Sequence, residues 1–459
     1  MEEMKILTPD LANALLEERK LSDLRELADR TPPADLALLF EELPETTIPR
    51  LFRILHKELA AETFTEMSPD LQEKLIVSFS DAELRNVLDE MFYDDTVDLI
   101  EEMPSNVVKR ILANSRPEDR RVINALLKYP TDSAGGIMNV EYVSLKPTHT
   151  VREALTVIRR VGVNKETIYT CYVTDRDRHL LGIVEAKDLL LSERDTLISE
   201  IMEEDIVYAR TLDDREETAQ LLAKYALLAL PVVDTENRLV GIVTVDDAME
   251  VIQTEAEEDF SVMAATTPDE TPYVKASVFS LWKNRIPWLA ILMISATFTG
   301  IIISAFEGAL ARVVVLTSFI PMLMGTGGNS GSQASVTVIR GLSLGELTPR
   351  DWFRVMWKEL RVSILCGLTL AVLTFGKVLL VDRLLLANPD VTVTVALAVS
   401  LTLCAVVIVA KLIGGLLPLL ADKIGLDPAV MASPFITTLV DALALLIYFT
   451  VAGSLIPGL

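Results

Sequence analysis

The sequence predicts a multi-domain membrane protein, with an N-terminal α-helical superhelical domain, a tandem α/β domain, an acidic linker helix and a five-helix transmembrane domain. Half of the residues are hydrophobic, although the net charge is −24. Residues 1–283 contain 57 acidic and 31 basic side chains, whereas the remainder contains nine and eleven. A strongly acidic soluble part is therefore joined to a membrane part, and its field attracts cations and disfavours a nucleic-acid partner. The expected segments are 1–130 (helical domain), 131–250 (tandem domain), 246–280 (linker helix) and 284–459 (transmembrane domain).

Residues 1–130 read as short helices separated by turns at a regular spacing. An apolar residue before a turn recurs near Leu43, Met67, Phe79, Met91 and Met103, at intervals of 24 and then 12 residues. Short helices stacked as a small superhelix produce such a period. Acidic residues gather near one expected helix start, where carboxylates interact favourably with the helix dipole, so capping and solubility are an alternative to a cation site. These residues are Asp94, Asp95 and Asp98.

A duplication marks the tandem domain. Residues 172–189 and 231–248 are similar at an offset of 59, which aligns Gly182 with Gly241. Each copy reads as a β-hairpin that runs into a helix. The pair resembles tandem CBS (cystathionine β-synthase-type) modules, which commonly dimerise and sense adenine nucleotides or ions. The second copy keeps the Gly-x-x-Thr-x-x-Asp pattern, so Thr244 and Asp247 are candidate ATP contacts, whereas the first copy has Glu185 in place of the threonine.

The linker that follows is acidic and has no compensating base between Val240 and Val274. At helical spacing its acidic residues cover about half of the circumference. A solvated face usually mixes charges of both signs, so this face is a candidate cation site, with plain solvation as the alternative. The residues are Asp247, Glu250, Glu255, Glu258 and Asp259. Three cysteines and three histidines are scattered along the chain, which favours a hard cation held by oxygen over a Cys/His-ligated metal.

Five apolar runs are long enough to cross a bilayer. They lie near 286–306, 313–339, 362–380, 391–420 and 428–456. Basic residues cluster after the second run, between Arg340 and Arg361, so the positive-inside rule places the N-terminal part in the cytoplasm and the C-terminus outside. The N-terminus has no apolar stretch typical of a signal peptide, which agrees with a cytoplasmic soluble part. Lys411, inside the fourth run, is expected to extend toward the cytoplasmic interface.

The second and fifth runs contain the polar residues of interest. Gly325-Thr-Gly-Gly-Asn-Ser-Gly-Ser-Gln in the second run is expected either to permit close helix packing or to expose backbone carbonyls to a pore. Asp441 lies in the fifth run, where a central charge costs at least ~2.5–3.5 kcal/mol and is usually kept for a cavity, a partner or an ion. Asp427, Pro434, Asp441 and Tyr448 recur every seven residues and predict one wet, cation-attracting face, with Thr437 one turn below Asp441. The alternative is a protonated or paired structural carboxylate.

The order of these segments resembles the MgtE family of bacterial magnesium channels. The Gly325–Gln333 segment and the fifth-run segments Leu426-Asp-Pro-Ala and Pro434-Phe-Ile-Thr-Thr-Leu-Val-Asp carry the resemblance. It implies a homodimer with a pore between subunits, an aspartate at position 441 that binds hydrated Mg²⁺, and a linker "plug" helix that closes the pore when Mg²⁺ binds to the cytoplasmic domains. The implied pore and metal residues are Gly325, Gly328, Asn329, Thr437, Asp427, Asp441, Glu62, Asp94, Asp98, Asp214, Glu216, Asp247, Glu250, Glu255, Glu258 and Asp259.

Together, these features predict a Mg²⁺ channel or transporter of the cell inner membrane that imports Mg²⁺ and is closed by Mg²⁺ on its acidic cytoplasmic domains. Two rivals stay open: a transporter of another divalent cation such as Mn²⁺ or Co²⁺, and a membrane-anchored CBS sensor that does not transport. An enzyme is not expected, because the sequence shows no nucleophile–base constellation or phosphate loop.

Overall fold

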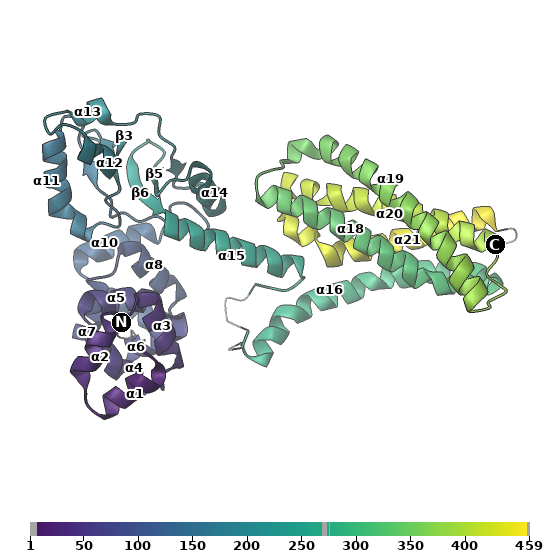
Figure 1. Ribbon diagram of the computed structural model, residues 1–459, viewed down its shortest axis with the longest axis horizontal. Coiled ribbons are helices and arrows are strands. Elements are labelled where there is room, and N and C mark those ends of the chain that lie inside the picture. Colours follow the sequence, from purple (N-terminus) through teal and green to yellow (C-terminus); the bar gives the residue numbers. More distant parts are fainter. Residues whose placement is uncertain (1–6, 269–272, 275, 457–459) are drawn as a thin grey trace, which may run out of the picture. The chain divides into compact units, whose positions relative to one another are not determined.

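The chain separates into two compact units, Met1–Gln253 and Thr254–Leu459. A computed structural model describes residues 7–268, 273–274 and 276–456. Figure 1 labels the elements of both units. Each unit has its own hydrophobic core, so the two are described separately below.

Short helices build the first part of the first unit. Proline stands in the first turn of several of them, where its missing N–H leaves no hydrogen bond unmade. Four buried rings (Phe40, Phe52, Phe64 and Phe79) contact one another through the core, with centroids 5.2–6.4 Å apart. The predicted helical superhelix is confirmed. Its helices are α1 (Pro9–Glu17), α2 (Leu21–Ala28), α3 (Pro33–Glu42), α4 (Ile48–Phe52), α5 (Lys57–Thr65), α6 (Pro69–Ser78), α7 (Asp81–Leu88), α8 (Tyr93–Glu102), α9 (Ser105–Asn114) and α10 (Pro117–Leu126).

The predicted duplication is confirmed as two three-stranded sheets with the same topology. In each, a short strand pairs in parallel with the first strand of an antiparallel hairpin. Val173 pairs with Gly182 and Val232 with Gly241, so the 59-residue offset holds in the register. The first copy contains β1 (Ser144–Leu145), α11 (Val151–Val161), η1 (Gly162–Asn164), β2 (Thr170–Thr174), β3 (Leu180–Glu185) and α12 (Ala186–Leu191). The second contains α13 (Ile198–Ile201), β4 (Ala209–Arg210), α14 (Arg215–Tyr225), β5 (Ala229–Val233) and β6 (Leu239–Thr244).

The acidic linker forms one helix, α15 (Val245–Met263), whose first half belongs to the first unit and whose second half belongs to the second. Its first turn is capped by the Thr244 backbone N–H and hydroxyl, which both donate to the Asp247 carboxylate. The helix ends at Met263 and does not continue through the expected segment 246–280, of which residues 269–272 and 275 lie outside the described part. The next helix begins at Val278.

The second unit is a set of long apolar helices. α18 packs against α20 and α21, α19 packs against α20, and α16 packs against α21 (Figure 1). Among the described residues, four helical segments are long and apolar enough to cross a membrane; they contain α16, α19, α20 and α21. The helix at the expected second span, α18, is present but is too rich in polar and small residues to meet that criterion. The elements are α16 (Val278–Ala305), α17 (Glu307–Arg312), η2 (Val314–Phe319), α18 (Ile320–Ser343), η3 (Pro349–Asp351), α19 (Trp352–Lys377), the π-helical η4 (Val378–Leu385), α20 (Val393–Lys423), η5 (Pro428–Met431) and α21 (Ser433–Leu455).

Glycines on α18 and α20 let these helices approach at backbone distance. A Cβ on Gly414 would lie 2.2 Å from the Gly331 carbonyl oxygen, and backbone atoms cannot move aside cheaply. Gly414→Ala is therefore expected to push α18 and α20 apart at a cost of about 1–3 kcal/mol, and to lower the melting temperature of the purified protein. Gly376→Ala is the matched control, because nothing lies within 4 Å of its added Cβ. Equal melting temperatures for the two variants would contradict the packing argument.

Candidate cation sites

Asp441 lies in the third turn of α21 and its side chain is half-buried. Its Oδ1 atom is buried and has no hydrogen-bond partner among the described residues. Gly328 lies against Thr437, and Gly327 lies against Val440, so α18 and α21 run antiparallel. This register places Asp441 at the level of Gly325, beside which an added Cβ would meet nothing within 4 Å. A buried carboxylate oxygen without a hydrogen-bond partner in a membrane helix is costly unless a cation or a partner subunit compensates it.

A polar stripe on α18 faces outward beside this position. Gly325, Asn329 and Gln333 are exposed at helical spacing, whereas Gly327, Gly328 and Gly331 are buried against other helices. The helix is continuous through the glycine-rich segment, so the glycines serve close packing and the backbone carbonyls stay in the helical hydrogen-bond pattern. Amide side chains exposed to lipid would leave donors and acceptors unmet. The stripe is therefore a surface for water, an ion path or a second subunit.

The expected wet face of the fifth run is wrong at Tyr448, whereas Asp427 is exposed but lies outside α21. Asp427 precedes α21 and caps η5, accepting a hydrogen bond of 2.7 Å from the Ala429 N–H. Tyr448 is fully buried, and its hydroxyl donates to the Leu316 carbonyl at 3.0 Å. The seven-residue spacing does not extend to Asp427 because that residue lies in another element, and at Tyr448 the same face meets the protein core. In the middle of the run, Asp441 is half-buried.

The end of α15 lies at the end of the membrane domain where α18 finishes and α21 starts. The Ser343 hydroxyl donates to Asp259 Oδ2 at 2.8 Å. Val262 and Met263 pack against Ile339, Ala429 and Ala432. Burial raises the pKa of Asp259, the Ser343 hydrogen bond opposes this, and the nearby carboxylates of Asp427 and Glu255 add to it. Three of the sequence-predicted acids therefore gather here, whereas Glu258 is exposed on the same helix.

A larger group of carboxylates forms inside the first unit. We call it the acidic cluster: Asp94, Asp95 and Asp98 on α8, Glu141 and Glu166 from loops of the first CBS copy, and Asp247 and Glu250 on α15. Its members come from three segments that are far apart in the sequence. Asp94, Asp95, Asp98 and Asp247 form no ion pair within 4.0 Å to any basic residue in the described part of the chain. These four carboxylates thus lack a salt-bridge partner, whereas Glu141 lies near enough to Lys165 to interact with it.

Titration behaviour reflects this crowding. Burial is the main cause that raises the pKa of Asp95 to about 6, with the Asp247 carboxylate adding to it. Surrounding protein and the Asp95 carboxylate raise the pKa of Asp98 to about 7, although this residue is exposed at the surface of the first unit. Burial and Asp247 likewise raise the pKa of Glu166 to about 7, and burial raises the pKa of Asp94 well above its ordinary value. A hard cation bound here would remove the repulsion, because carboxylate oxygens are its preferred ligands.

Not every predicted residue joins the acidic cluster. Glu62 is exposed on α5, whereas Glu66, four residues later, lies close enough to interact with Asp95. Asp214 caps α14 by accepting hydrogen bonds from the N–H groups of Glu216 and Glu217. Glu216 accepts from Gln220 in the next turn. Glu141 and Glu166 were missed because they lie in loops without a motif; only the pattern of acids on α8 and α15 was visible in the sequence.

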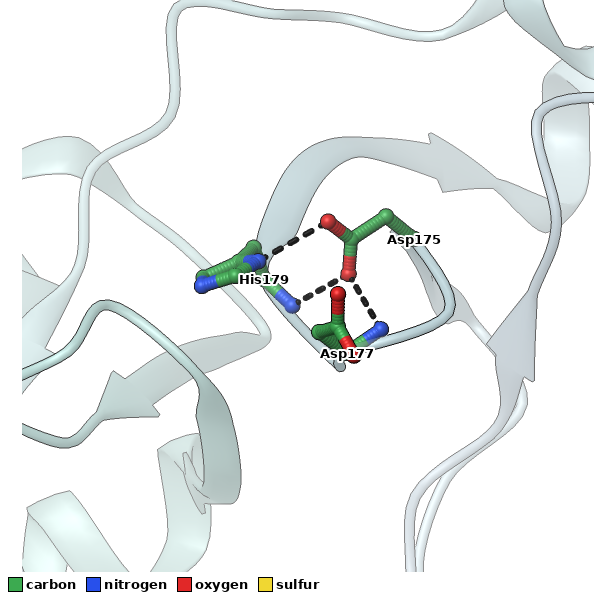
Figure 2. Close-up of side chains that lie close together, drawn as sticks. All are labelled: Asp175, Asp177 and His179. Atoms are coloured by element: carbon green, nitrogen blue, oxygen red, sulfur yellow. Dashed lines mark hydrogen bonds and ion pairs between the residues drawn. The ribbon is translucent and has the colours of Figure 1, made fainter.

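A second acidic group lies in the β2–β3 hairpin and looks, at first, like a metal site. Figure 2 shows Asp175, Asp177 and His179, whose potential ligand atoms lie within 4.8 Å of one another. Asp175 accepts hydrogen bonds from the N–H groups of Asp177 and His179, and its Oδ2 atom contacts His179 Nδ1 at 2.8 Å. In the second CBS copy, Asp234 accepts the same two backbone hydrogen bonds. The group is therefore a turn stabilised by hydrogen bonds from its backbone to an aspartate side chain, and both copies contain it.

Comparisons with known proteins agree with this arrangement. Residues 320–451 match the family described as "Divalent cation transporter" (MgtE), residues 31–132 match the MgtE intracellular N domain, and residues 134–194 and 198–254 match CBS domains. The chain is 37% identical to the magnesium transporter MgtE of Thermus thermophilus over 446 residues, covering 96% of this chain and 97% of that protein. The chain belongs to the MgtE family. A Bacillus subtilis member of the family is 34% identical, with 97% and 96% of the two chains covered.

Solved structures extend the comparison to the soluble part. A structure described as the cytosolic domain of the Mg²⁺ channel MgtE in complex with ATP is 37% identical, with a TM-score of 0.50, and covers 52% of this chain and 98% of that one. A structure described as the soluble part of a magnesium transporter is 31% identical, with a TM-score of 0.51, and covers 54% and 97%. The fold of the helical domain and CBS pair is therefore that of the MgtE cytosolic domain.

Proposed function

We propose that this chain carries Mg²⁺ across the cell inner membrane into the cytoplasm and that Mg²⁺ bound to its acidic cytoplasmic part closes the path. The carrying observation is the desolvated, unpartnered Oδ1 atom of Asp441 beside the polar stripe of α18. Mg²⁺ sheds its water shell reluctantly, so a site with few carboxylates and retained waters suits it. Membership of a family whose named relatives are magnesium transporters supports the choice of ion. No catalytic activity is assigned.

The polar stripe supports a homodimer as the working form. Asn329 and Gln333 are exposed on one chain, where lipid would leave their amides without hydrogen bonds. A second copy placed against this stripe would cover them and bring a second Asp441 toward the same ion. A two-fold axis makes such an interface self-complementary. Two carboxylates around one hydrated Mg²⁺ then replace the single carboxylate that one subunit offers.

The acidic cluster fits regulatory Mg²⁺. Its carboxylates come from α8, the first CBS copy and the first half of α15, and their mutual repulsion opposes the compact arrangement of these segments. Divalent cations held there would favour that arrangement by binding it more tightly than the open one. Asp95, Asp98 and Asp247 would hold such ions. Three further carboxylates gather at the other end of α15, those of Asp259, Asp427 and Glu255.

ATP is proposed as a further ligand of the second CBS copy, on the precedent of the related structure described with ATP. Thr244 and Asp247 are the residues that the motif indicates. In this chain the Thr244 hydroxyl donates to the Asp247 carboxylate, and Thr244 is buried. Both groups are therefore already in use for capping α15, so nucleotide contact at Thr244 would compete with the cap.

Purified protein in liposomes tests the proposal. We expect Mg²⁺ influx that falls as Mg²⁺ is raised on the side of the soluble domains, and weaker inhibition of this influx by equal concentrations of Mn²⁺ or Co²⁺. If Mn²⁺ or Co²⁺ enters the liposomes in preference to Mg²⁺, the protein is a transporter of that cation and the proposed ion is wrong. A complete lack of divalent flux from correctly folded protein would favour a membrane-anchored CBS sensor instead.

A further inference from the structure

Lys411 lies near the middle of α20, and that its side chain extends toward the cytoplasmic interface stays a prediction. Its side chain is only 6% exposed. In the described part of the chain it forms no hydrogen bond and no ion pair within 4.0 Å. A lysine that lies mostly inside a bundle of apolar helices is stabilised by a nearby negative charge, because lipid and apolar side chains do not solvate its ammonium.

Glu359 on α19 is the acidic group placed to compensate it. A Cβ on Gly415 would lie 3.0 Å from Glu359 Cγ, so the stem of Glu359 crosses α20 at Gly415. Position 411 is one turn from position 415 and lies on the same face of α20. The Glu359 carboxylate interacts electrostatically with the Lys411 ammonium, and the other basic group that it senses is Lys358. Because residue 415 is glycine and has no side chain, the Glu359 side chain can pack against α20 at this position.

An adjacent face of the same turns, about 100° round the helix, carries the contact with α18. The Ala410 carbonyl oxygen lies 3.2 Å from a Cβ placed on Gly331, and Gly414 touches the Gly331 backbone. α18 in turn contacts α21 through Gly328 and Thr437, one turn from Asp441. Rotating α20 about its axis would therefore break its contacts with α19 and α18 together. Glu359 on α19 is therefore linked to Asp441 on α21 by successive contacts between helices, through α20 and α18.

We propose that the half-buried Glu359 and the buried Lys411, which lie more than 4.0 Å apart in this structure, attract each other across the α19–α20 contact and set the rotation of α20, and that they act as positioning residues for the α18–α21 contact that carries Asp441. The pair joins two helices inside the membrane domain, where the low dielectric strengthens the attraction between its charges. The ion-conduction consequence rests on the proposed function; the pairing itself does not.

A charge-exchange cycle tests the pair. Glu359→Gln and Lys411→Met are each expected to lower Mg²⁺ flux in proteoliposomes about tenfold or more and to lower the melting temperature, because each leaves an unpaired buried charge. Glu359→Lys combined with Lys411→Glu is expected to restore flux to within about threefold of the wild type and to recover the melting temperature. Lys423→Met, at the exposed end of the same helix, is the matched control and is expected to change neither.

The exchange variant decides the outcome even if a single variant fails to fold. The pair would be overturned if the Mg²⁺ flux of the exchange variant were no higher than the product of the fractional fluxes of the two single variants. A Lys411→Met protein with the same flux and melting temperature as Lys423→Met would also overturn it. The melting-temperature cycle is independent of transport. If the wild type carries no Mg²⁺, the proposed function fails while the cycle still tests the pair.

Discussion

Asp441→Asn is expected to reduce Mg²⁺ flux about 100-fold or more, with little change in expression or melting temperature. The substitution keeps the shape of the side chain and removes its charge. Losing one partner of a buried charge interaction costs about 2–5 kcal/mol, and each 1.4 kcal/mol is tenfold in an equilibrium. In a homodimer the substitution removes both carboxylates from the path, so the effect on the bound ion is doubled.

Asp390→Asn is the matched control, since Asp390 is exposed in the turn before α20. Flux through both variants is measured in proteoliposomes, and growth of a magnesium-dependent strain provides a second readout. Wild-type flux through Asp441→Asn would make Asp441 a structural carboxylate. The melting temperature of Asp441→Asn provides a further test. It is expected to be unchanged or higher than that of the wild type, because the buried Oδ1 atom has no hydrogen-bond partner to lose.

The architecture was accessible from sequence because it rests on local periodicity. The 12-residue interval of turns predicts the helices around Phe79 and Met103, and the 59-residue offset predicts the equivalent hairpins at Gly182 and Gly241. Both signals repeat, so packing requirements reinforce them. The Asp441 position was visible for another reason: an acid in an apolar run stands out whatever surrounds it.

What the sequence did not reveal depends on contacts between distant segments. Glu141 and Glu166 lie in loops of the first CBS copy, and nothing around them indicates that they meet Asp247. Tyr448 matched a seven-residue pattern, but whether such a face meets solvent or core depends on η2, where its hydrogen-bond acceptor lies. The proposed interaction of Lys411 with Glu359 was not visible in the sequence for the same reason, since Glu359 lies on another helix.

In the absence of Mg²⁺, the acidic cluster is expected to make the first unit less stable at pH 8 than at pH 6. The folded-state pKa values of Asp95, Asp98 and Glu166 are raised to about 6–7. Ordinary values for these groups are about 4. Their protonated forms therefore favour the folded state, and this contribution is complete below about pH 4 and is lost as the pH rises through 6 and 7. Saturating Mg²⁺ is expected to flatten the dependence, because bound cations hold the carboxylates ionised at both pH values.

Neutralising the cluster is expected to have the same effect as lowering the pH. Asp95→Asn, Asp98→Asn and Asp247→Asn together remove three mutually repelling charges, so the Mg²⁺-free melting temperature of residues 1–253 is expected to rise by about 2–8 °C, as 1–2 kcal/mol produces in a domain of this size. The additional rise on adding Mg²⁺ is expected to shrink. Asp177→Asn, Glu204→Gln and Asp205→Asn remove three exposed charges as the matched control.

The two sets separate local repulsion from net charge, since both change the charge by the same amount. Equal melting temperatures for the cluster and control variants would show that the acidic cluster carries no special repulsion. A Mg²⁺-induced rise as large in the cluster variant as in the wild type would place the regulatory ions elsewhere. In the full-length protein, loss of that rise is expected to accompany loss of closure by cytoplasmic Mg²⁺, because the same bound ions favour both the compact first unit and the closed path.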